Sequence, residues 1–210
     1  MALSLTTGSR NGAVLLDKDG TLLENVPYNV DPEQMRLAPK AADGLRRLAY
    51  TSLPLVVISN QPGVALGYFP EAALRAVRRR LAELFAQNGA VLAGFFYCPH
   101  HPDGNVARYA HACACRKPRS GLLRRAATQL GFSLRHSWMV GDILDDVAAG
   151  SQTLCRTILV DCGNETEWVR TPQRQPDYTV SDFDAAARII VQNSRMRYVA
   201  GAAAYAAMPQ

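Results

Sequence analysis

Short apolar runs that alternate with helical patterns constrain the fold of this chain more than any other feature. Residues 13–16, 54–59 and 137–141 are short and mostly apolar, as is typical of buried parallel strands. Amphipathic helical patterns follow at residues 39–52, 71–89 and 121–131. Further strands are predicted at 91–98, 156–161 and 177–180, and further helices at 145–152 and 182–192. This alternation predicts an α/β fold with a mostly parallel sheet covered by helices on both faces.

The length of 210 residues fits one domain, which we expect over residues 1–193. The alanine-rich tail, 194–210, is expected to be flexible or a frayed helix. No apolar run is long enough to span a bilayer, and the first residues lack a secretory pattern, so a cytoplasmic protein without a membrane partner is expected. The net charge of +5 includes an arginine-rich helix at 75–80, interpreted as a solvated helix face rather than a nucleic-acid interface.

Two aspartates follow the first predicted strand in the stretch LLDKDGTL. Asp17 and Asp19 lie two residues apart, so an extended chain would point them to the same side. Gly20 permits a sharp turn, in which Thr21 can form a hydrogen bond. Paired carboxylates suit a hard cation such as Mg²⁺, and a carboxylate can attack phosphorus. The alternative is a simple acidic turn.

Polar residues also follow the later strands. Ser59 and Asn60 end the strand in VVISNQPG, and together with free backbone N–H groups they can hold phosphate oxygens. Lys117 precedes a predicted helix and is a suitable cation for a phosphoryl group. Asp142 ends a strand and Asp146 follows it. Because ligands of such sheets bind at the carboxyl ends of the strands, these side chains are expected to converge.

The order of these motifs resembles that of the haloacid dehalogenase superfamily of Mg²⁺-dependent phosphatases. The resemblance extends from about residue 13 to residue 192 and implies a three-layer, Rossmann-like fold. It implies that Asp17 is the nucleophile, which forms an aspartyl-phosphate, and that Asp19 is the general acid and base. It further implies Mg²⁺ ligation by Asp17, the Asp19 carbonyl and Asp142 with support from Asp146, and phosphoryl stabilisation by Ser59 and Lys117.

Soft metal ligands are concentrated in the stretch CPHHPDGNVARYAHACACRKP. Three interpretations compete: a disulfide, a metal site, or chance within a loop. Cys98, His100, Cys113 and Cys115 make a closed set of four ligands typical of a structural Zn²⁺ site, in a loop over 98–115. His101 or His111 can replace His100 as the fourth ligand. A disulfide is disfavoured in the cytoplasm, and Cys155 and Cys162 are expected to be small buried residues.

The same stretch narrows the resemblance to the D-glycero-D-manno-heptose 1,7-bisphosphate 7-phosphatase group, with the zinc loop of the histidinol-phosphatase domain as the rival. This group is compact, without a separate cap domain, and a monomer is expected. Its substrate-contacting positions correspond here to Asn25, Val26, Pro27, Tyr28, Ser59, Asn60, Gln61, Pro62, Arg116 and Lys117.

The resemblance predicts a phosphomonoesterase that removes the 7-phosphate of the heptose bisphosphate. Two positions depart from the group: Leu66 stands where an arginine is usual, and Ile143 where a lysine is usual. The alternatives are a phosphatase for histidinol phosphate or another sugar phosphate, a non-catalytic phosphatase-like binding protein, and an arginine-rich nucleic-acid binder.

Overall fold

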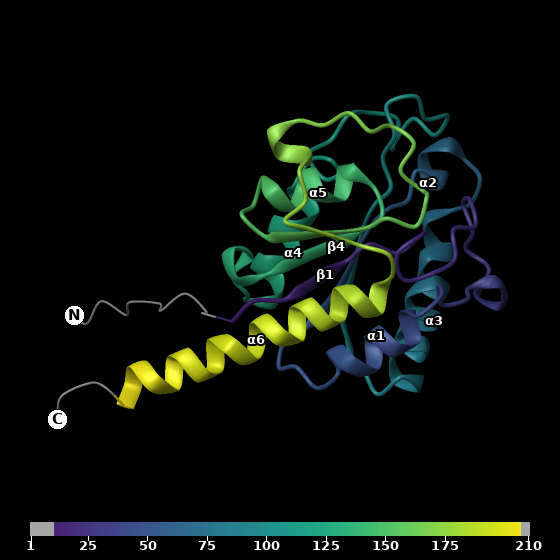
Figure 1. Cartoon of the computed structure of the whole chain (residues 1–210). Coiled ribbons are helices and arrows are strands. Elements are labelled where there is room, and N and C mark those ends of the chain that lie inside the picture. Colours follow the sequence, from purple (N-terminus) through teal and green to yellow (C-terminus); the bar gives the residue numbers. More distant parts are fainter. Residues whose placement is uncertain (1–10, 207–210) are drawn as a thin grey trace, which may run out of the picture.

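The computed structural model describes residues 11–206 of the chain, with side chains as far as residue 194. Its strands are β1 (Val14–Leu16), β2 (Leu55–Asn60), β3 (Leu92–Cys98), β4 (Trp138–Gly141), β5 (Arg156–Val160) and β6 (Tyr178–Val180). Its α-helices are α1 (Ala41–Leu48), α2 (Gly63–Leu66), α3 (Leu74–Gln87), α4 (Gly121–Leu130), α5 (Leu144–Ser151) and α6 (Phe183–Ala206). Strands and helices alternate along the chain as the sequence predicts (Figure 1).

The six strands form one sheet in the order β3-β2-β1-β4-β5-β6. Every neighbouring pair is parallel, so all strands end at the same edge. The chain order reverses between β1 and β4, which are direct neighbours although a long stretch of sequence separates them. Such a switch point opens a crevice at the carboxyl ends of the strands, where ligands of open α/β sheets bind.

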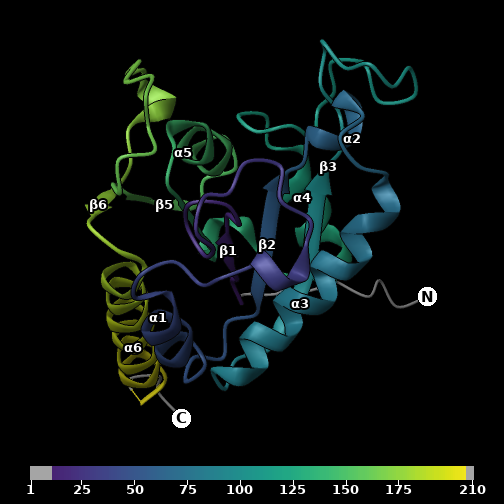
Figure 2. The ribbon, with the colours of Figure 1, turned by 90° about the vertical axis from the view of Figure 1, so that its right-hand side faces the viewer.

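Helices cover both faces of the sheet because consecutive strand residues point to opposite sides. On one face, Val14 and Leu16 pack with residues of α1, α3 and α6. On the other face, Leu15 packs with residues of α4 and α5. Figures 1 and 2 show α1 and α6 side by side on the first face. The three-layer α/β architecture is therefore confirmed, and within residues 11–206 a single sheet carries both layers without a separate cap domain.

Two elements differ from the sequence-based expectation. The short helix α2 was not predicted; its chain turns back at Gly67, which has a φ of 81°. Helix α6, predicted over residues 182–192, continues to Ala206. The expectation that the tail at 194–210 is flexible or a frayed helix stays a prediction, and residues 207–210 lie outside the described part of the chain. None of the described helices combines the length and apolar character that crossing a membrane requires.

Candidate active site and metal centres

A cluster of buried carboxylates lies where β1 and β4 end. Asp17 follows β1, Asp142 follows β4, and Asp146 lies in the first turn of α5. Each offers a carboxylate oxygen within 4.8 Å of the others, and all three residues are buried. Carboxylates at such separations repel one another unless a cation compensates. The convergence expected from the sequence is therefore present in the fold.

Lys117 supplies a cation to this cluster. Its Nζ contacts Asp17 and lies 2.5 Å from Asp146 Oδ1, while also donating to the carbonyl of Ile58 at 3.2 Å. Burial lowers the pKa of Lys117, but the two carboxylates outweigh burial and raise its pKa overall. The Asn60 side chain holds the Lys117 backbone from both sides, accepting from its N–H at 3.0 Å and donating to its carbonyl at 3.1 Å. Lys117 is thus a fixed, fully charged group.

Asp142 is oriented by two neutral donors. Thr21 Oγ1 donates to Asp142 Oδ1 at 2.9 Å, and Asn164 Nδ2 donates to Asp142 Oδ2 at 2.8 Å. Burial and the charge of Asp17 nevertheless raise the pKa of Asp142 to about 6. The sequence indicated a turn role for Thr21, whereas Asn164 was missed. It lies in the long connection between β5 and β6, where no motif distinguishes it.

Asp19 lies beside the cluster rather than in it. Its carboxylate pairs with Lys18 at 2.5 Å and accepts a hydrogen bond from Gln61 at 3.3 Å. Gln61 also donates to the hydroxyl of buried Ser59 at 2.8 Å. Burial raises the pKa of Asp19 above its ordinary value despite the neighbouring Lys18. A carboxyl group with a raised pKa is suited to donating a proton near neutral pH.

The carboxylate cluster has the donor set of a hard divalent cation. Its oxygens come from Asp17, Asp142 and Asp146, and Mg²⁺ prefers carboxylate oxygen ligands. Asp146 is fully buried, and its Oδ1 pairs with the Lys117 ammonium group. Burial raises the pKa of Asp146, Lys117 opposes that shift, and Asp17 and Asp142 add to it. One ammonium group does not fully compensate these carboxylates, so the cluster fits a magnesium ion.

Gly20 is required where the loop after β1 meets Asp142. Its φ is 87°, and a Cβ there would lie 2.1 Å from Asp142 Oδ2 and 2.4 Å from Asn164 Nδ2. Gly89 provides a matched control, because its φ is 70° but a Cβ would meet nothing within 4 Å.

Replacement of these two glycines separates backbone strain from displacement of Asp142. Gly89→Ala is expected to cost about 1–2 kcal/mol of unfolding free energy from backbone strain alone. Gly20→Ala should cost about 1–3 kcal/mol more from overpacking and should also weaken Mg²⁺ binding. Urea unfolding and calorimetric Mg²⁺ titration measure both effects. Equal losses in the two variants would contradict the placement of Asp142 against Gly20.

The sulfur and imidazole ligands predicted from the sequence form a second cluster. Cys98 ends β3, and the chain returns fifteen residues later to place Cys113 and Cys115 beside it, with Sγ–Sγ distances of 3.1–3.4 Å. His100 Nδ1 lies 3.2 Å from Cys115 Sγ and 3.5 Å from Cys98 Sγ. All four ligand atoms lie within 4.8 Å of one another. Three thiolates and one imidazole fit a closed, tetrahedral zinc site.

The spare histidines and cysteines lie outside this cluster. His101 Nδ1 instead accepts from the Asp103 N–H at 3.2 Å, and His111 lies beside the His100 ring with the ring centroids 4.4 Å apart. Cys155 is buried, as expected. The expectation for Cys162 was wrong: it is exposed, because β5 ends at Val160 and the chain leaves the sheet there.

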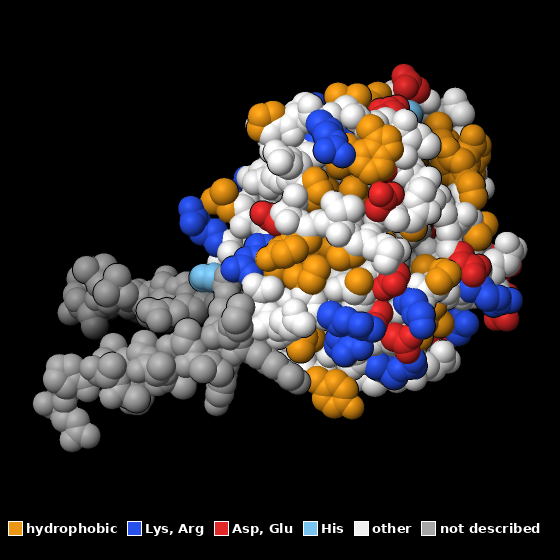
Figure 3. Space-filling view, in the orientation of Figure 1, with side chains coloured by type: hydrophobic (Ala, Val, Ile, Leu, Met, Phe, Trp, Pro, Cys, Tyr) orange, Lys and Arg blue, Asp and Glu red, His pale blue; other side chains and the backbone are white. Residues whose placement is uncertain are grey.

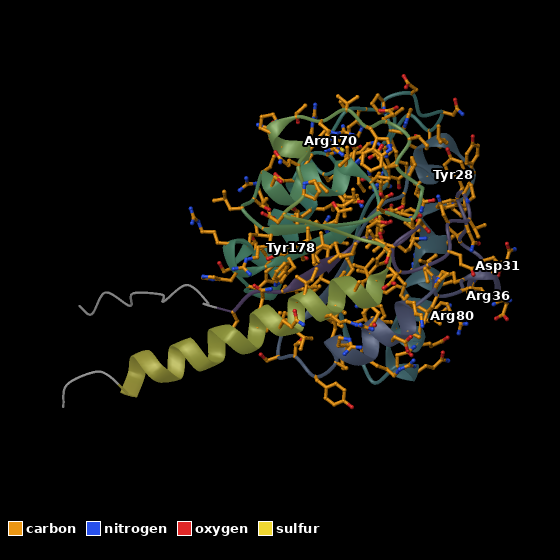
Figure 4. The ribbon with its side chains drawn as sticks, viewed as in Figure 1. Tyr28, Asp31, Arg36, Arg80, Arg170 and Tyr178 are labelled. Atoms are coloured by element: carbon orange, nitrogen blue, oxygen red, sulfur yellow. The ribbon has the colours of Figure 1, made fainter. Side chains whose placement is uncertain are left out.

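The predicted substrate-contacting residues in the loop after Asp19 differ in exposure. Asn25, Pro27 and Tyr28 are exposed, and Val26 is half-buried. Tyr28 has a φ of 56° and its ring meets that of Tyr68 edge-on at 4.7 Å; Figure 4 shows it on the side of the molecule that carries α2.

Pro62 and Arg116 were also predicted to contact the substrate, and each adjoins another residue predicted to do so. Pro62 immediately precedes α2, next to Gln61. Arg116 adjoins Lys117, and its buried Nη1 has no hydrogen-bond partner. An arginine with an unsatisfied donor is poised to bind an anionic oxygen.

The two departures from the heptose phosphatase pattern lie at the start and end of short elements. Leu66 is the last residue of α2, and its carbonyl accepts from Asn105 at 3.1 Å. Ile143 directly precedes α5, and its N–H lies 3.5 Å from Asp146 Oδ2. Neither replaces a ligand of the carboxylate cluster.

Comparison with known proteins identifies relatives of this chain. A family model described as HAD-hydrolase-like matches residues 114–186. The D-glycero-beta-D-manno-heptose-1,7-bisphosphate 7-phosphatase of Escherichia coli (strain K12) is 34% identical over 166 residues, covering 75% of this chain and 87% of the relative. The enzyme of the same name from Pseudomonas aeruginosa is 31% identical over 180 residues, covering 85% and 97%.

Solved structures of phosphatases share the fold of this chain. A putative HAD-like phosphatase from Mesorhizobium loti superposes with a TM-score of 0.76 at 28% identity, covering 88% of this chain and 87% of the other. The D,D-heptose 1,7-bisphosphate phosphatase from B. bronchiseptica, complexed with magnesium and phosphate, has a TM-score of 0.68 at 28% identity, covering 87% and 99%. By its fold and its curated relatives, the chain belongs to the D-glycero-beta-D-manno-heptose-1,7-bisphosphate 7-phosphatase family of haloacid dehalogenase-like phosphatases.

Proposed function

We propose that this protein is a Mg²⁺-dependent phosphomonoesterase that works through an aspartyl-phosphate on Asp17. The observation that carries the proposal is the placement of Asp17 at the switch point of the sheet, with Lys117 against its carboxylate and Asp142 and Asp146 beside it. The Lys117 ammonium group contacts the carboxylate of Asp17, and a carboxylate is the group that would attack phosphorus in this mechanism.

The proposed reaction has two steps. A carboxylate oxygen of Asp17 attacks phosphorus, and the bond from phosphorus to the sugar oxygen breaks while Asp19 gives that oxygen its proton. Asp19, now ionised, takes a proton from water, which attacks the phosphorus and restores the Asp17 carboxylate as inorganic phosphate leaves. The raised pKa of Asp19 suits the first step, and its contact with Gln61 holds it in position.

Magnesium held by Asp17, Asp142, Asp146 and the Asp19 carbonyl would neutralise charge on the transferring phosphoryl group. Ser59 and Lys117 are proposed to stabilise the same charge from the protein side. Asn60 contributes by fixing the Lys117 backbone.

For the substrate, we propose removal of the 7-phosphate of D-glycero-D-manno-heptose 1,7-bisphosphate. The relatives that cover most of this chain carry this activity in their names. Residues Asn25–Tyr28 would contact the sugar, and Arg116 would bind the second phosphate through its unsatisfied guanidinium. Each candidate catalytic position carries the residue type that the reaction requires, which favours an enzyme over a non-catalytic binding protein.

A substrate panel tests this assignment. Phosphate release should have the highest kcat/KM with heptose 1,7-bisphosphate, compared with histidinol phosphate and simple hexose monophosphates. Arg116→Ala should lower kcat/KM for the bisphosphate by about tenfold or more, because it removes a charge-assisted hydrogen bond. Arg119→Ala, at an exposed neighbouring arginine, is the matched control. Equal kcat/KM across the panel would reject the heptose assignment while leaving the phosphatase chemistry standing.

We further propose that Cys98, His100, Cys113 and Cys115 bind a structural zinc ion. The loop that they would fix leads directly into Arg116 and Lys117, and the N–H of Arg116 already donates to Cys113 Sγ at 3.3 Å. A closed site leaves no position for substrate, so the zinc would position the two cations rather than take part in the reaction. Free thiols persist in a reducing compartment, which fits a cytoplasmic enzyme. For the oligomeric state we propose a monomer, in line with the expectation from the sequence.

Elemental analysis tests the zinc proposal. The purified protein should carry about one zinc per chain, as four-ligand sites do. Cys113→Ser should lose that zinc and lower the temperature of unfolding, whereas Cys155→Ser, at a buried cysteine outside the cluster, should retain it. Stoichiometric zinc in Cys113→Ser would exclude Cys113 as a ligand.

A further inference from the structure

A cavity separate from the carboxylate cluster lies between α5 and the chain that joins β5 to β6. Its volume is ≈ 530 Å³, within the range of about 300–1,000 Å³ typical of small-molecule sites. It is lined by Leu144 and Leu159 at its base and by residues of the connection around Trp168, Arg170 and Arg174. None of the residues assigned to the reaction lines it.

An aromatic side chain and an arginine form one wall of this cavity. Trp168 is 47% exposed, an unusual position for a large apolar ring. The guanidinium carbon of Arg170 lies 5.7 Å from the centre of that ring, and Arg170 forms no ion pair with any described residue. Figure 4 labels Arg170, and Figure 3 shows Lys or Arg side chains next to hydrophobic ones in this region of the same face. The wall thus offers a flat apolar surface next to a positively charged guanidinium group.

A second arginine, Arg174, also lines the cavity. Arg174 Nη1 lies 3.1 Å from Asp145 Oδ1, but its buried Nε has no hydrogen-bond partner. Asp145 pairs with Arg174, and the buried Glu165 carboxylate, which accepts a hydrogen bond from the Leu144 N–H, adds a second negative charge nearby. Arg170 is therefore the arginine of this cavity that forms no ion pair with a described residue, and a guanidinium group of this kind can bind phosphate through charge-assisted hydrogen bonds.

We infer that this cavity, formed by Trp168, Arg170 and Arg174, binds a nucleoside monophosphate or a similar anion that carries a planar ring. The base stacks on the half-exposed indole of Trp168, and the phosphate binds the guanidinium of Arg170, while Arg174 stays paired with Asp145 at the side of the cavity. Tight binding should require both a planar ring and a phosphate, because the wall offers an aromatic ring for the first and a guanidinium group for the second. This cavity is distinct from the proposed active site. A binding measurement, rather than an activity assay, therefore detects a ligand in it.

Tryptophan fluorescence tests the inference directly. The chain has two tryptophans, and Trp138 is 4% exposed in the core, so a surface ligand reaches only Trp168. Titration of the intact protein with AMP should quench the emission saturably. Adenosine alone and inorganic phosphate alone should each bind at least about tenfold more weakly, because each loses one of the two contacts. A full response to inorganic phosphate alone would overturn the assignment to a ring-bearing ligand.

Variants connect the response to the cavity. Arg170→Ala should raise the Kd for AMP by about tenfold, the usual loss for one charge-assisted contact. Arg46→Ala removes the same charge from α1, in the opposite helical layer, and should leave the Kd unchanged. Trp168→Leu, followed by calorimetry, should lose binding while retaining the unfolding temperature, since its side chain is half-exposed. Absence of saturable quenching, or equal Kd values in Arg170→Ala and the unsubstituted protein, would overturn the inference.

Discussion

Asp17→Asn is expected to lower kcat by at least about 10⁴-fold, because an amide cannot form the acyl phosphate that the mechanism requires. The side chain keeps its size and its position at the end of β1. The substitution removes one negative charge from a buried cluster in which Lys117 can still pair with Asp146. The free energy of unfolding should therefore change by no more than about 1 kcal/mol. Phosphate release and urea unfolding, measured on the same preparation, separate chemistry from folding.

The control for this experiment is Asp145→Asn. Asp145 lies one residue from Asp146 but pairs with Arg174 rather than with Lys117. Its kcat should stay within about threefold of the unsubstituted protein, as expected for a charge outside the reacting groups. If Asp17→Asn kept substantial turnover, the nucleophile would have to be another residue, and the assignment of Asp17 would fail.

Lys117→Met is expected to have the second large effect, on both stability and rate. Nζ of Lys117 is buried against Asp17 and Asp146, so its removal leaves buried carboxylates without their counter-charge. Losing one partner of a buried ion pair costs about 3–5 kcal/mol. The rate should fall by at least about 10²-fold, because one donor to the phosphoryl group is lost. Chemical denaturation and steady-state kinetics measure the two effects.

A double variant and a control make the interpretation of Lys117 specific. In Lys117→Met with Asp17→Asn, part of the lost stability should return, since one uncompensated carboxylate is removed. Mg²⁺ should also stabilise Lys117→Met more than it stabilises the unsubstituted protein, because a cation binding the cluster restores the missing charge. Lys40→Met, at a lysine whose side chain is 63% exposed, should change neither quantity appreciably. Additive losses in the double variant would show that Lys117 and Asp17 are not coupled.

Much of this protein could be predicted from local patterns. The strand and helix alternation predicted the parallel sheet, because strands buried on both faces must be apolar throughout. The positions of Asp17 and Asp142 directly after strands predicted that they would meet, because parallel strands end at one edge. The spacing of Cys98, His100, Cys113 and Cys115 predicted a four-ligand cluster, because thiolates and imidazoles form such sets around zinc.

Other features depend on contacts that no local pattern encodes. Asn164 reaches Asp142 from a long connection, although the two residues are 22 positions apart in sequence. Gly20 must lack a side chain because Asp142 occupies that space. His100, rather than His101 or His111, meets the three cysteines because the direction of the chain after β3 points its ring toward them. The exposure of Cys162 follows from where β5 ends, which an apolar pattern locates only approximately.

The sequence by itself determined the fold class, the residues able to do phosphoryl chemistry and the residues able to hold zinc, because these follow from side-chain type and from short-range periodicity. Only the tertiary structure decided which carboxylates share Lys117, which histidine joins the thiols, and that Trp168, Arg170 and Arg174 line one cavity. The physical reason is that these arrangements are set by packing between segments distant in sequence. Distances of a few ångströms between such segments decide which groups pair, and no single segment contains that information.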